Sequence, residues 1–340
     1  MSKINIPDIS VVIPVYNGCL YIGQTLRSLL NQSFINFEII CVNDSSADSS
    51  LEILESFAKN DHRIKVFSKE NGGTATSAII YGLQYVTGKY FMYSSQDDLF
   101  SVDLLEKNYN KAIDSNADVV IPDMSYYWDT PVASQNNLGI YGIGGDRTKE
   151  LSGREAFVLS LDWTIHGFAL YRMDIIKKIG FSNYGLSSDE YSTRMFFFNS
   201  NKIAFSDGVF YYRQDNSEAI TKKWSISQLG YIETCNRLEE FAFKNGFKEN
   251  EIKIIYKTLL NELIRIQLLY SRNINNITQK DRGEYIKNIK MICKINSHKI
   301  KAIEVNNFKE LVKKYLCLNY WGLVFLCKNI EYRLIYNNRV

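Results

Sequence analysis

Residues 9–122 alternate between short apolar segments and longer segments whose apolar residues recur at helical spacing. The short segments are rich in β-branched or aromatic residues and lie at 9–15, 37–42, 64–67, 90–93 and 119–121. Continuous apolar runs of this length are typical of strands buried on both faces of a parallel sheet. The pattern therefore predicts such a sheet.

The segments between these runs predict amphipathic helices. Their apolar residues share one helical face in three places: Ile22, Leu26, Leu29 and Leu30; Leu51, Leu54, Phe57 and Ala58; and Leu104, Leu105, Tyr109, Ala112 and Ile113. Ser49 followed by Glu52 predicts a capping box at the second helix. Alternating strands and helices indicate an α/β fold, which binds its ligands at the carboxyl ends of the strands.

The rest of the chain changes character twice. Residues 126–225 are irregular and rich in Gly, Ser, Asp and aromatic residues. Beyond them the chain contains no proline and has long helical patterns rich in Lys, Ile, Asn and Leu. We therefore predict that residues 1–125 and 126–225 form two halves of one α/β domain, followed by a helical region over residues 226–340.

Composition excludes several classes of protein. The 340 residues are 46% hydrophobic and 23% charged, which is typical of a folded chain. A net charge of +3 gives no reason to expect a nucleic-acid partner. The six cysteines form no CxxC pair, so we expect reduced thiols in a cytoplasmic protein rather than a zinc site. The first residues lack the apolar core of a signal peptide.

Polar residues follow three of the predicted strands. Tyr16 and Asn17 come after the first strand, Asp44 after the second, and Asp97 and Asp98 after the fourth. An aspartate near an aromatic ring can hold a nucleobase, and adjacent carboxylates can hold a divalent cation against a diphosphate. Taken singly, each residue is as typical of a turn, a cap or a core position. Their joint placement at one sheet edge is what indicates a site.

Six motifs over residues 8–125 resemble glycosyltransferase family 2, a group of inverting, nucleotide-sugar-dependent enzymes with the GT-A fold. They are SVVIPVYN at 10–17, SLLNQ at 28–32, FEIICVNDSS at 37–46, ENGG at 70–73, TGKY at 87–90 and QDD at 96–98. A weaker resemblance covers residues 155–221, including SSDEYSTR and YYRQDNSEAIT. The resemblance implies a GT-A fold with a mostly parallel central sheet and a C-terminal helical extension.

The resemblance also implies roles for individual residues. Nucleotide-sugar contacts are implied for Pro14, Tyr16, Asn17, Asp44, Asn71, Gly72, Gly73, Gln96 and Asp97, with Asp44 matching the aspartate that reads uracil. Mn²⁺ or Mg²⁺ is implied at Asp97 and Asp98. The implied catalytic base is Asp189, and Glu190 stays open as the alternative.

Four positions depart from the family pattern. Ser95 stands where the DXD motif has its first aspartate, and no Arg-Asn pair follows Gly73. The late acidic motif reads Ser-Asp-Glu rather than Glu-Asp, and the Tyr-Arg pair at 212–213 is not followed by histidine. These departures affect residues that the resemblance assigns to the metal, to the nucleotide-sugar donor and to the catalytic base.

The sequence therefore predicts an inverting glycosyltransferase that moves a sugar from a UDP-sugar to a saccharide or lipid-linked saccharide acceptor. The resemblance places this transfer in the assembly of bacterial surface polysaccharide or other cell-envelope material. Two alternatives stay open. The replacement at Ser95 favours a non-catalytic nucleotide-sugar or glycan-binding protein of the same fold. A nucleotidyltransferase is disfavoured because the loop at 16–21 has no basic residue to hold a triphosphate.

The C-terminal region raises the question of a membrane. Residues 280–340 contain 13 Lys or Arg against 5 Asp or Glu. Residues 307–316 predict a helix with an apolar face opposite Lys309, Lys313 and Lys314, and the apolar run at 316–327 is too short to span a bilayer. Three interpretations stay open: contact with the inner face of the cell membrane, packing on the catalytic body, or a homodimer.

Overall fold

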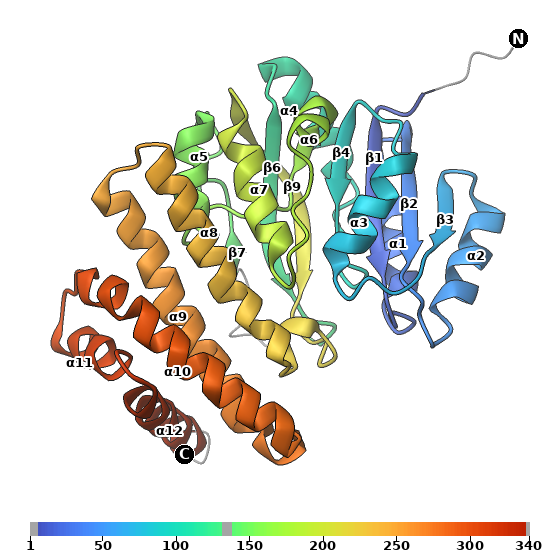
Figure 1. The fold of residues 1–340 in the computed structure, drawn as a ribbon. Coiled ribbons are helices and arrows are strands. Elements are labelled where there is room, and N and C mark those ends of the chain that lie inside the picture. The colour runs from blue at the N-terminus through green and yellow to red at the C-terminus, as the bar shows by residue number, and fades with distance from the viewer. Residues whose placement is uncertain (1–5, 131–137, 338–340) are drawn as a thin grey trace, which may run out of the picture. The chain divides into compact units, whose positions relative to one another are not determined.

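The apolar runs form strands of one sheet in the computed structural model, which describes residues 6–130 and 138–337 (Figure 1). The strands are β1 (Ile9–Val15), β2 (Phe37–Asn43), β3 (Ile64–Ser68), β4 (Tyr90–Tyr93), β5 (Leu99–Phe100), β6 (Val119–Tyr127), β7 (Gly139–Ile140), β8 (Leu170–Arg172) and β9 (Ile203–Arg213). Their order is β3-β2-β1-β4-β8-β6-β9-β5, and β7 pairs with β6. Pairing is parallel from β3 to β4 and between β6 and β9. The short pairings of β8 with β4 and β6, of β5 with β9 and of β7 with β6 are antiparallel, so the predicted α/β class is confirmed with a mixed sheet whose longer pairings are parallel.

The chain divides into two compact units, Met1–Asn216 and Ser217–Val340. The helices of the first unit are α1 (Ile22–Leu30), α2 (Ser50–Asn60), α3 (Ala75–Gly82), α4 (Leu104–Ser115), α5 (Gly153–Ser160), α6 (Met173–Ile179) and α7 (Ser188–Phe198). The second unit contains α8 (Gly230–Lys244), α9 (Glu249–Asn273), α10 (Gln279–Ala302), α11 (Phe308–Leu316) and α12 (Tyr320–Asn337). The finer domain limits at residues 125 and 225 stay predictions.

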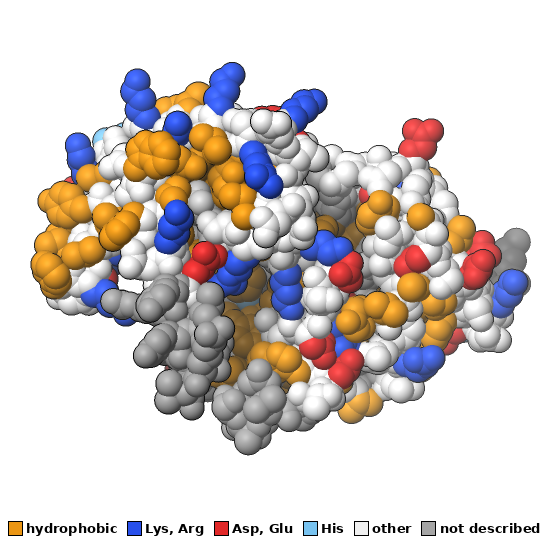
Figure 2. Space-filling view, turned by 90° about the horizontal axis from the view of Figure 1, so that it is seen from below, with side chains coloured by type: hydrophobic (Ala, Val, Ile, Leu, Met, Phe, Trp, Pro, Cys, Tyr) orange, Lys and Arg blue, Asp and Glu red, His pale blue; other side chains and the backbone are white. Residues whose placement is uncertain are grey.

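The second unit is helical, as its periodic pattern predicts. Its interior consists of one face from each long helix, including Leu238 of α8, Leu263 of α9, Tyr285 of α10 and Leu323 of α12. Figure 2 shows hydrophobic side chains among lysines and arginines on the surface of this unit. Within the described ranges, no helix combines the length and apolarity that crossing a bilayer requires.

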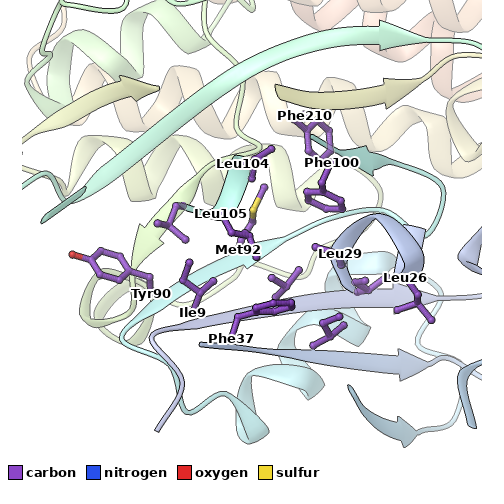
Figure 3. Packing of buried hydrophobic residues seen from close by; sticks show 14 of the residues in the cluster. Ile9, Leu26, Leu29, Phe37, Tyr90, Met92, Phe100, Leu104, Leu105 and Phe210 are labelled. Atoms are coloured by element: carbon purple, nitrogen blue, oxygen red, sulfur yellow. The ribbon is translucent and has the colours of Figure 1, made fainter. Parts of the chain in front are cut away.

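Two hydrophobic clusters fill the two faces of the sheet in the first unit. Because side chains alternate along a strand, Val11 and Ile13 of β1 lie in one cluster and Val12 lies in the other. Helices α1, α2 and α4 cover the first face, and α3, α5, α6 and α7 cover the second. Figure 3 shows the first cluster, in which the rings of Phe100 and Phe210 meet edge to face at 5.5 Å. This packing fixes the strand ends.

Two local predictions are wrong. Ile113 is 46% exposed, because the inward face of α4 is completed by Asn108, which is buried and accepts a hydrogen bond from the Ser206 hydroxyl. The capping box at Ser49 does not form, since Ser49 makes no side-chain cap contact. The Asp48 carboxylate takes that place and accepts from the Ser50 amide at 3.0 Å.

Candidate active site

The loops after β1 and β4 are joined by the side-chain amide of Gln96. Its Oε1 accepts from the Tyr16 backbone N–H at 2.9 Å, and its Nε2 donates to the Tyr16 carbonyl at 3.1 Å. A Cβ at Gly18 would lie 2.3 Å from Gln96 Oε1, so a side chain at this position would displace the Gln96 amide from these hydrogen bonds. The structure therefore brings the predicted residues Tyr16 and Gln96 together, with the Tyr16 ring 49% exposed.

The loops after β1 and β2 are joined by Asn17. This residue has φ +49°, and its Oδ1 accepts from the Ala47 N–H at 2.8 Å while its own N–H donates to the Ser46 hydroxyl at 3.1 Å. Pro14 lies half-buried in β1, where it pairs in register with Val42. The Asn17 side chain therefore holds the backbone of the loop after β2.

Asp44 lies at the end of β2 and is 5% exposed. Its Oδ1 accepts from Lys69 Nζ at 2.7 Å, and its carboxylate accepts from the Gly72 N–H at 3.0 and 3.2 Å. A neighbouring cation therefore compensates its charge. Lys69 was not predicted as a site residue, although it follows β3 at the same edge of the sheet.

The other residues of the predicted glycine-containing loop shape this contact. The Asn71 Oδ1 accepts from the Gly73 N–H at 2.7 Å, and Gly73 has φ +74°, which a residue with a side chain rarely adopts. A Cβ at Gly72 would lie 2.0 Å from the Ser77 hydroxyl. The loop therefore presents backbone N–H groups beside Asp44 because glycines allow it to approach.

Asp97 and Asp98 point in different directions. Asp97 Oδ2 accepts from Asn216 Nδ2 at 2.6 Å. Asp98 is 1% exposed, its Oδ1 accepts from the Arg213 N–H at 3.1 Å, and its Oδ2 has no partner within the described part of the chain. Burial, together with the charge of Asp97, raises the pKa of Asp98 well above its ordinary value.

Arg213 at the end of β9 organises this loop, a role that was not predicted from the sequence. Its buried guanidinium donates from Nε to the Asp97 carbonyl at 2.7 Å and pairs through Nη1 with Asp129 at 2.8 Å and Asp215 at 3.1 Å. The guanidinium carbon lies 4.6 Å from the centre of the Tyr21 ring. Arg213 therefore fixes the backbone that carries Asp97.

Asp189 and Glu190 begin helix α7. Glu190 pairs with Arg194 one turn later, and Arg194 also donates to the Ser160 carbonyl at 2.8 Å. No ion pair of this kind compensates Asp189 among the described residues. Removal from water, and then the negative charge of Glu190, raise the pKa of Asp189 to about 6.

One tyrosine connects the two acidic pairs electrostatically. Burial raises the pKa of Tyr212 well above its ordinary value, and the charges of Asp98, Glu190 and Asp97 raise it further. All three carboxylates therefore act on one phenol. One member of the predicted catalytic pair, Glu190, therefore lies near the same tyrosine as the predicted metal pair.

The donor atoms around Asp97 suit a hard divalent cation. The Asp97 carboxylate supplies such oxygens, with its Oδ2 accepting from the Asn216 amide nitrogen at 2.6 Å, and Asp98 next to it in the chain has a buried Oδ2 without a partner in the described structure. No group of three or more His, Cys, Asp or Glu side chains that could hold a metal ion is found in the described ranges. The residues therefore fit an ion such as Mg²⁺ or Mn²⁺ that takes few protein ligands and completes its shell with diphosphate and water.

Comparison with known families agrees with this arrangement. The model of the family "Glycosyl transferase family 2" matches residues 10–180, which is half of the chain. The chain belongs to glycosyltransferase family 2 and is a glycosyltransferase.

Curated relatives carry the same description. Glycosyltransferase GlyG of Streptococcus pneumoniae is 30% identical over 233 residues, which are 64% of this chain and 75% of GlyG. An uncharacterized glycosyltransferase of Rickettsia typhi is 30% identical over 74% of this chain and 80% of its own length. Glycosyltransferase GlyA of S. pneumoniae is 26% identical over 76% of this chain, which spans only 42% of GlyA.

Solved structures show the same fold at low sequence identity. Residues 1–349 of S. aureus TarS in complex with UDP-GlcNAc align with a TM-score of 0.63 and 19% identity, over 87% of this chain and 84% of that one. The mannosyltransferase PcManGT from Pyrobaculum calidifontis, in complex with GDP-Man and Mn²⁺, aligns with a TM-score of 0.50 and 11% identity over 91% of this chain. The predicted GT-A fold is confirmed.

Proposed function

We propose that this glycosyltransferase moves a sugar, with inversion, from a UDP-sugar to a saccharide or lipid-linked saccharide acceptor. One observation carries the proposal: hydrogen bonds of Gln96, Asn17 and Asp44 join the loops after β1, β2, β3 and β4 into one edge. This edge offers the half-exposed Tyr16 ring and the Asp44 carboxylate to a nucleotide. As the family resemblance implies, we place this transfer in the assembly of bacterial surface polysaccharide.

Asp44 and Lys69 support uracil as the base. Uracil has an N–H between two carbonyl oxygens, so its N–H can donate to Asp44 while a carbonyl accepts from Lys69 or from the Gly72 N–H. Cytosine has an acceptor nitrogen in place of that N–H and would set a lone pair against the Asp44 carboxylate. The bound UDP-GlcNAc of TarS supports the same choice.

Asp97 is the residue that we assign to a divalent cation, with Asn216 beside it and Asp98 behind it. A bound cation supplies charge compensation for the departing diphosphate. Arg213 holds the Asp97 carbonyl, so the carboxylate is positioned before the donor binds. We assign Asp98 to positioning, because its Oδ1 accepts from the Arg213 N–H inside the protein.

Asp189 is the residue that we assign as the catalytic base, in preference to Glu190. A general base accepts a proton best when its pKa is near the working pH, and the pKa of Asp189 is raised to about 6. Glu190 is already engaged in an ion pair with Arg194. In the proposed reaction the acceptor hydroxyl gives its proton to Asp189 while its oxygen attacks the sugar carbon. The bond from that carbon to the UDP oxygen breaks, and UDP leaves with the electron pair.

Calorimetric titration with UDP, GDP, CDP and TDP, each with and without Mn²⁺, tests the donor site. We expect UDP to bind tightest and to need Mn²⁺ for binding. In Asp97→Ala, Mn²⁺ should no longer strengthen the binding of UDP. Asp114→Ala, which removes an exposed carboxylate from α4, is the matched control and should bind as the wild type does. Equal binding of all four nucleotides would exclude the uracil assignment, and binding of none would contradict the donor site. Radiolabelled UDP-sugars then identify the sugar.

A further inference from the structure

The last three helices of the second unit leave large apolar side chains exposed. They are Met291 and Ile295 on α10, Phe308, Val312 and Tyr315 on α11, and Trp321 and Phe325 on α12, with exposed fractions from 39% for Val312 to 79% for Phe308. Within each helix they are three or four residues apart and so share one face. We refer to these seven residues together as the C-terminal face.

The helices that carry this face contact one another. Lys290 of α10 places its Nζ 5.4 Å from the centres of both the Tyr320 and Trp321 rings of α12. Lys314 of α11 donates from Nζ to the carbonyl of Ile303, just after α10, at 2.7 Å. Figure 2 shows the corresponding mixture of hydrophobic and basic side chains on this unit. The C-terminal face is therefore carried by helices that contact one another.

Lysines are interleaved with the apolar residues. Lys287, Lys290 and Lys294 lie on the exposed side of α10 around Met291, Lys309 follows Phe308, and Lys328 lies one turn beyond Phe325. Exposed acidic side chains on these helices are Glu284 and Glu310, and Glu310 already accepts from the Asn306 N–H at 2.9 Å. The surface is thus both apolar and positively charged.

We propose that the C-terminal face binds the surface of an anionic phospholipid bilayer. Aromatic and aliphatic side chains of this kind enter the boundary between headgroups and acyl chains, while lysines extend to the phosphates. Anionic lipid attracts each lysine near the surface, which corresponds to roughly a fivefold change in binding per lysine.

A second copy of the chain fits this surface less well. Protein–protein interfaces are depleted in lysine, and a symmetric dimer through this face would bring the lysines of one copy against those of the other. A bilayer provides the opposite charge over an extended plane and needs no shape complementarity. The inference does not depend on the donor site, because it concerns the second unit alone.

Vesicle flotation of the full-length protein tests the proposal. We expect flotation with phosphatidylcholine–phosphatidylglycerol vesicles at low salt, little with phosphatidylcholine alone, and loss at high salt. Trp321→Ala/Phe325→Ala and Lys287→Glu/Lys294→Glu should each weaken binding at least tenfold. Trp321 should also shift its fluorescence to the blue on binding, and Trp321→Phe should remove that shift.

Two matched variants in the first unit serve as controls. Ile35→Ser removes an apolar side chain that is 77% exposed, and Lys177→Glu/Lys178→Glu reverses two exposed lysines. Both should float as the wild type does. Absence of flotation with anionic vesicles, or equal effects of control and test variants, would overturn the proposal. So would a dimer in sedimentation that Trp321→Ala/Phe325→Ala dissociates, because the face would then be covered by a second copy.

Discussion

The two acidic pairs of the first unit, Asp97–Asp98 and Asp189–Glu190, are treated by the fold in parallel ways. In each pair an arginine engages one member: the backbone N–H of Arg213 donates to Asp98, and the guanidinium of Arg194 pairs with Glu190. The other member keeps its carboxylate toward the site. The two engaged residues differ in how well they are compensated. Asp98 is enclosed and one of its oxygens has no partner in the described structure, whereas Glu190 forms an ion pair with Arg194.

The difference shows how adjacent carboxylates acquire separate chemistry. Two neighbouring charges in a poorly solvated region cannot both ionise easily, so the proton settles where compensation is weakest. In the first pair that member is Asp98, whose pKa is raised by burial and by the charge of Asp97. In the second pair it is Asp189, whose raised pKa makes it the better proton acceptor. The substitutions below test this division.

The largest effect is expected from Asp189→Asn. Loss of a general base typically costs about 10²–10⁴-fold in rate, and kcat with a UDP-sugar and an acceptor should fall by that amount while UDP binding stays unchanged. Glu190→Gln should cost less than about tenfold, because its charge only tunes the pKa of Asp189. Initial rates and calorimetry on both variants measure this. If Glu190→Gln were the inactive one, the base assignment would be reversed.

Asp97→Asn should have the next largest effect, about a hundredfold on kcat/KM, because it removes the charge that a cation needs next to the diphosphate. Asp98→Asn is its matched control. A protonated Asp98 resembles asparagine in shape and charge, so this variant should keep Mn²⁺ dependence and lose only a few-fold in rate. Titration of activity with Mn²⁺ compares the two. Equal loss of metal dependence in both variants would show that Asp98 is a ligand as well.

The sheet and its edge could be predicted because buried parallel strands appear in the sequence as continuous apolar runs. All five predicted strands formed, and Tyr16 and Gln96 meet because the residues that follow neighbouring parallel strands share one edge. Which residues of a helix face the core was harder to predict. Ala112 is buried and Ile113 is exposed although both are apolar and adjacent, since one residue is a rotation of about 100° around the helix.

The partners of the acidic residues could not be predicted in the same way. Lys69, Arg194 and Arg213 are long side chains, and the sequence does not say which oxygen each one reaches. Arg213 is 116 residues from the Asp97 carbonyl that it holds. Asn216 stands three residues after Arg213, so the segment that lacks the family histidine still supplies a polar side chain to Asp97. Such contacts depend on the tertiary fold.

The pH dependence of the reaction rate tests the pair Asp189–Glu190 in another way. Asp189 must be ionised to accept a proton, so kcat/KM should fall about tenfold per unit as the pH drops below about 6. Glu190 raises this pKa and the positive charge of Arg194 lowers it. Arg194→Gln should therefore move the acidic limb to higher pH, and Arg194→Lys should largely restore it. If the acidic limb of the pH–rate profile did not move in Arg194→Gln, a group other than Asp189 would control that limb.

The smallest effect concerns Asp44, a third carboxylate that is compensated by a lysine instead of an arginine. Lys69→Met removes the cation that lies 2.7 Å from Asp44 Oδ1 but keeps the length of the side chain. We expect the preference for UDP over CDP to fall about tenfold, since one charge-assisted hydrogen bond to the base is lost. Lys69→Arg should keep most of the preference, and Lys65→Met, near the start of β3 where Lys65 pairs with Glu38, should leave it unchanged. If Lys69→Met weakened UDP and CDP equally, Lys69 would only hold Asp44 in place, and the base would be read by Asp44 and the Gly72 N–H.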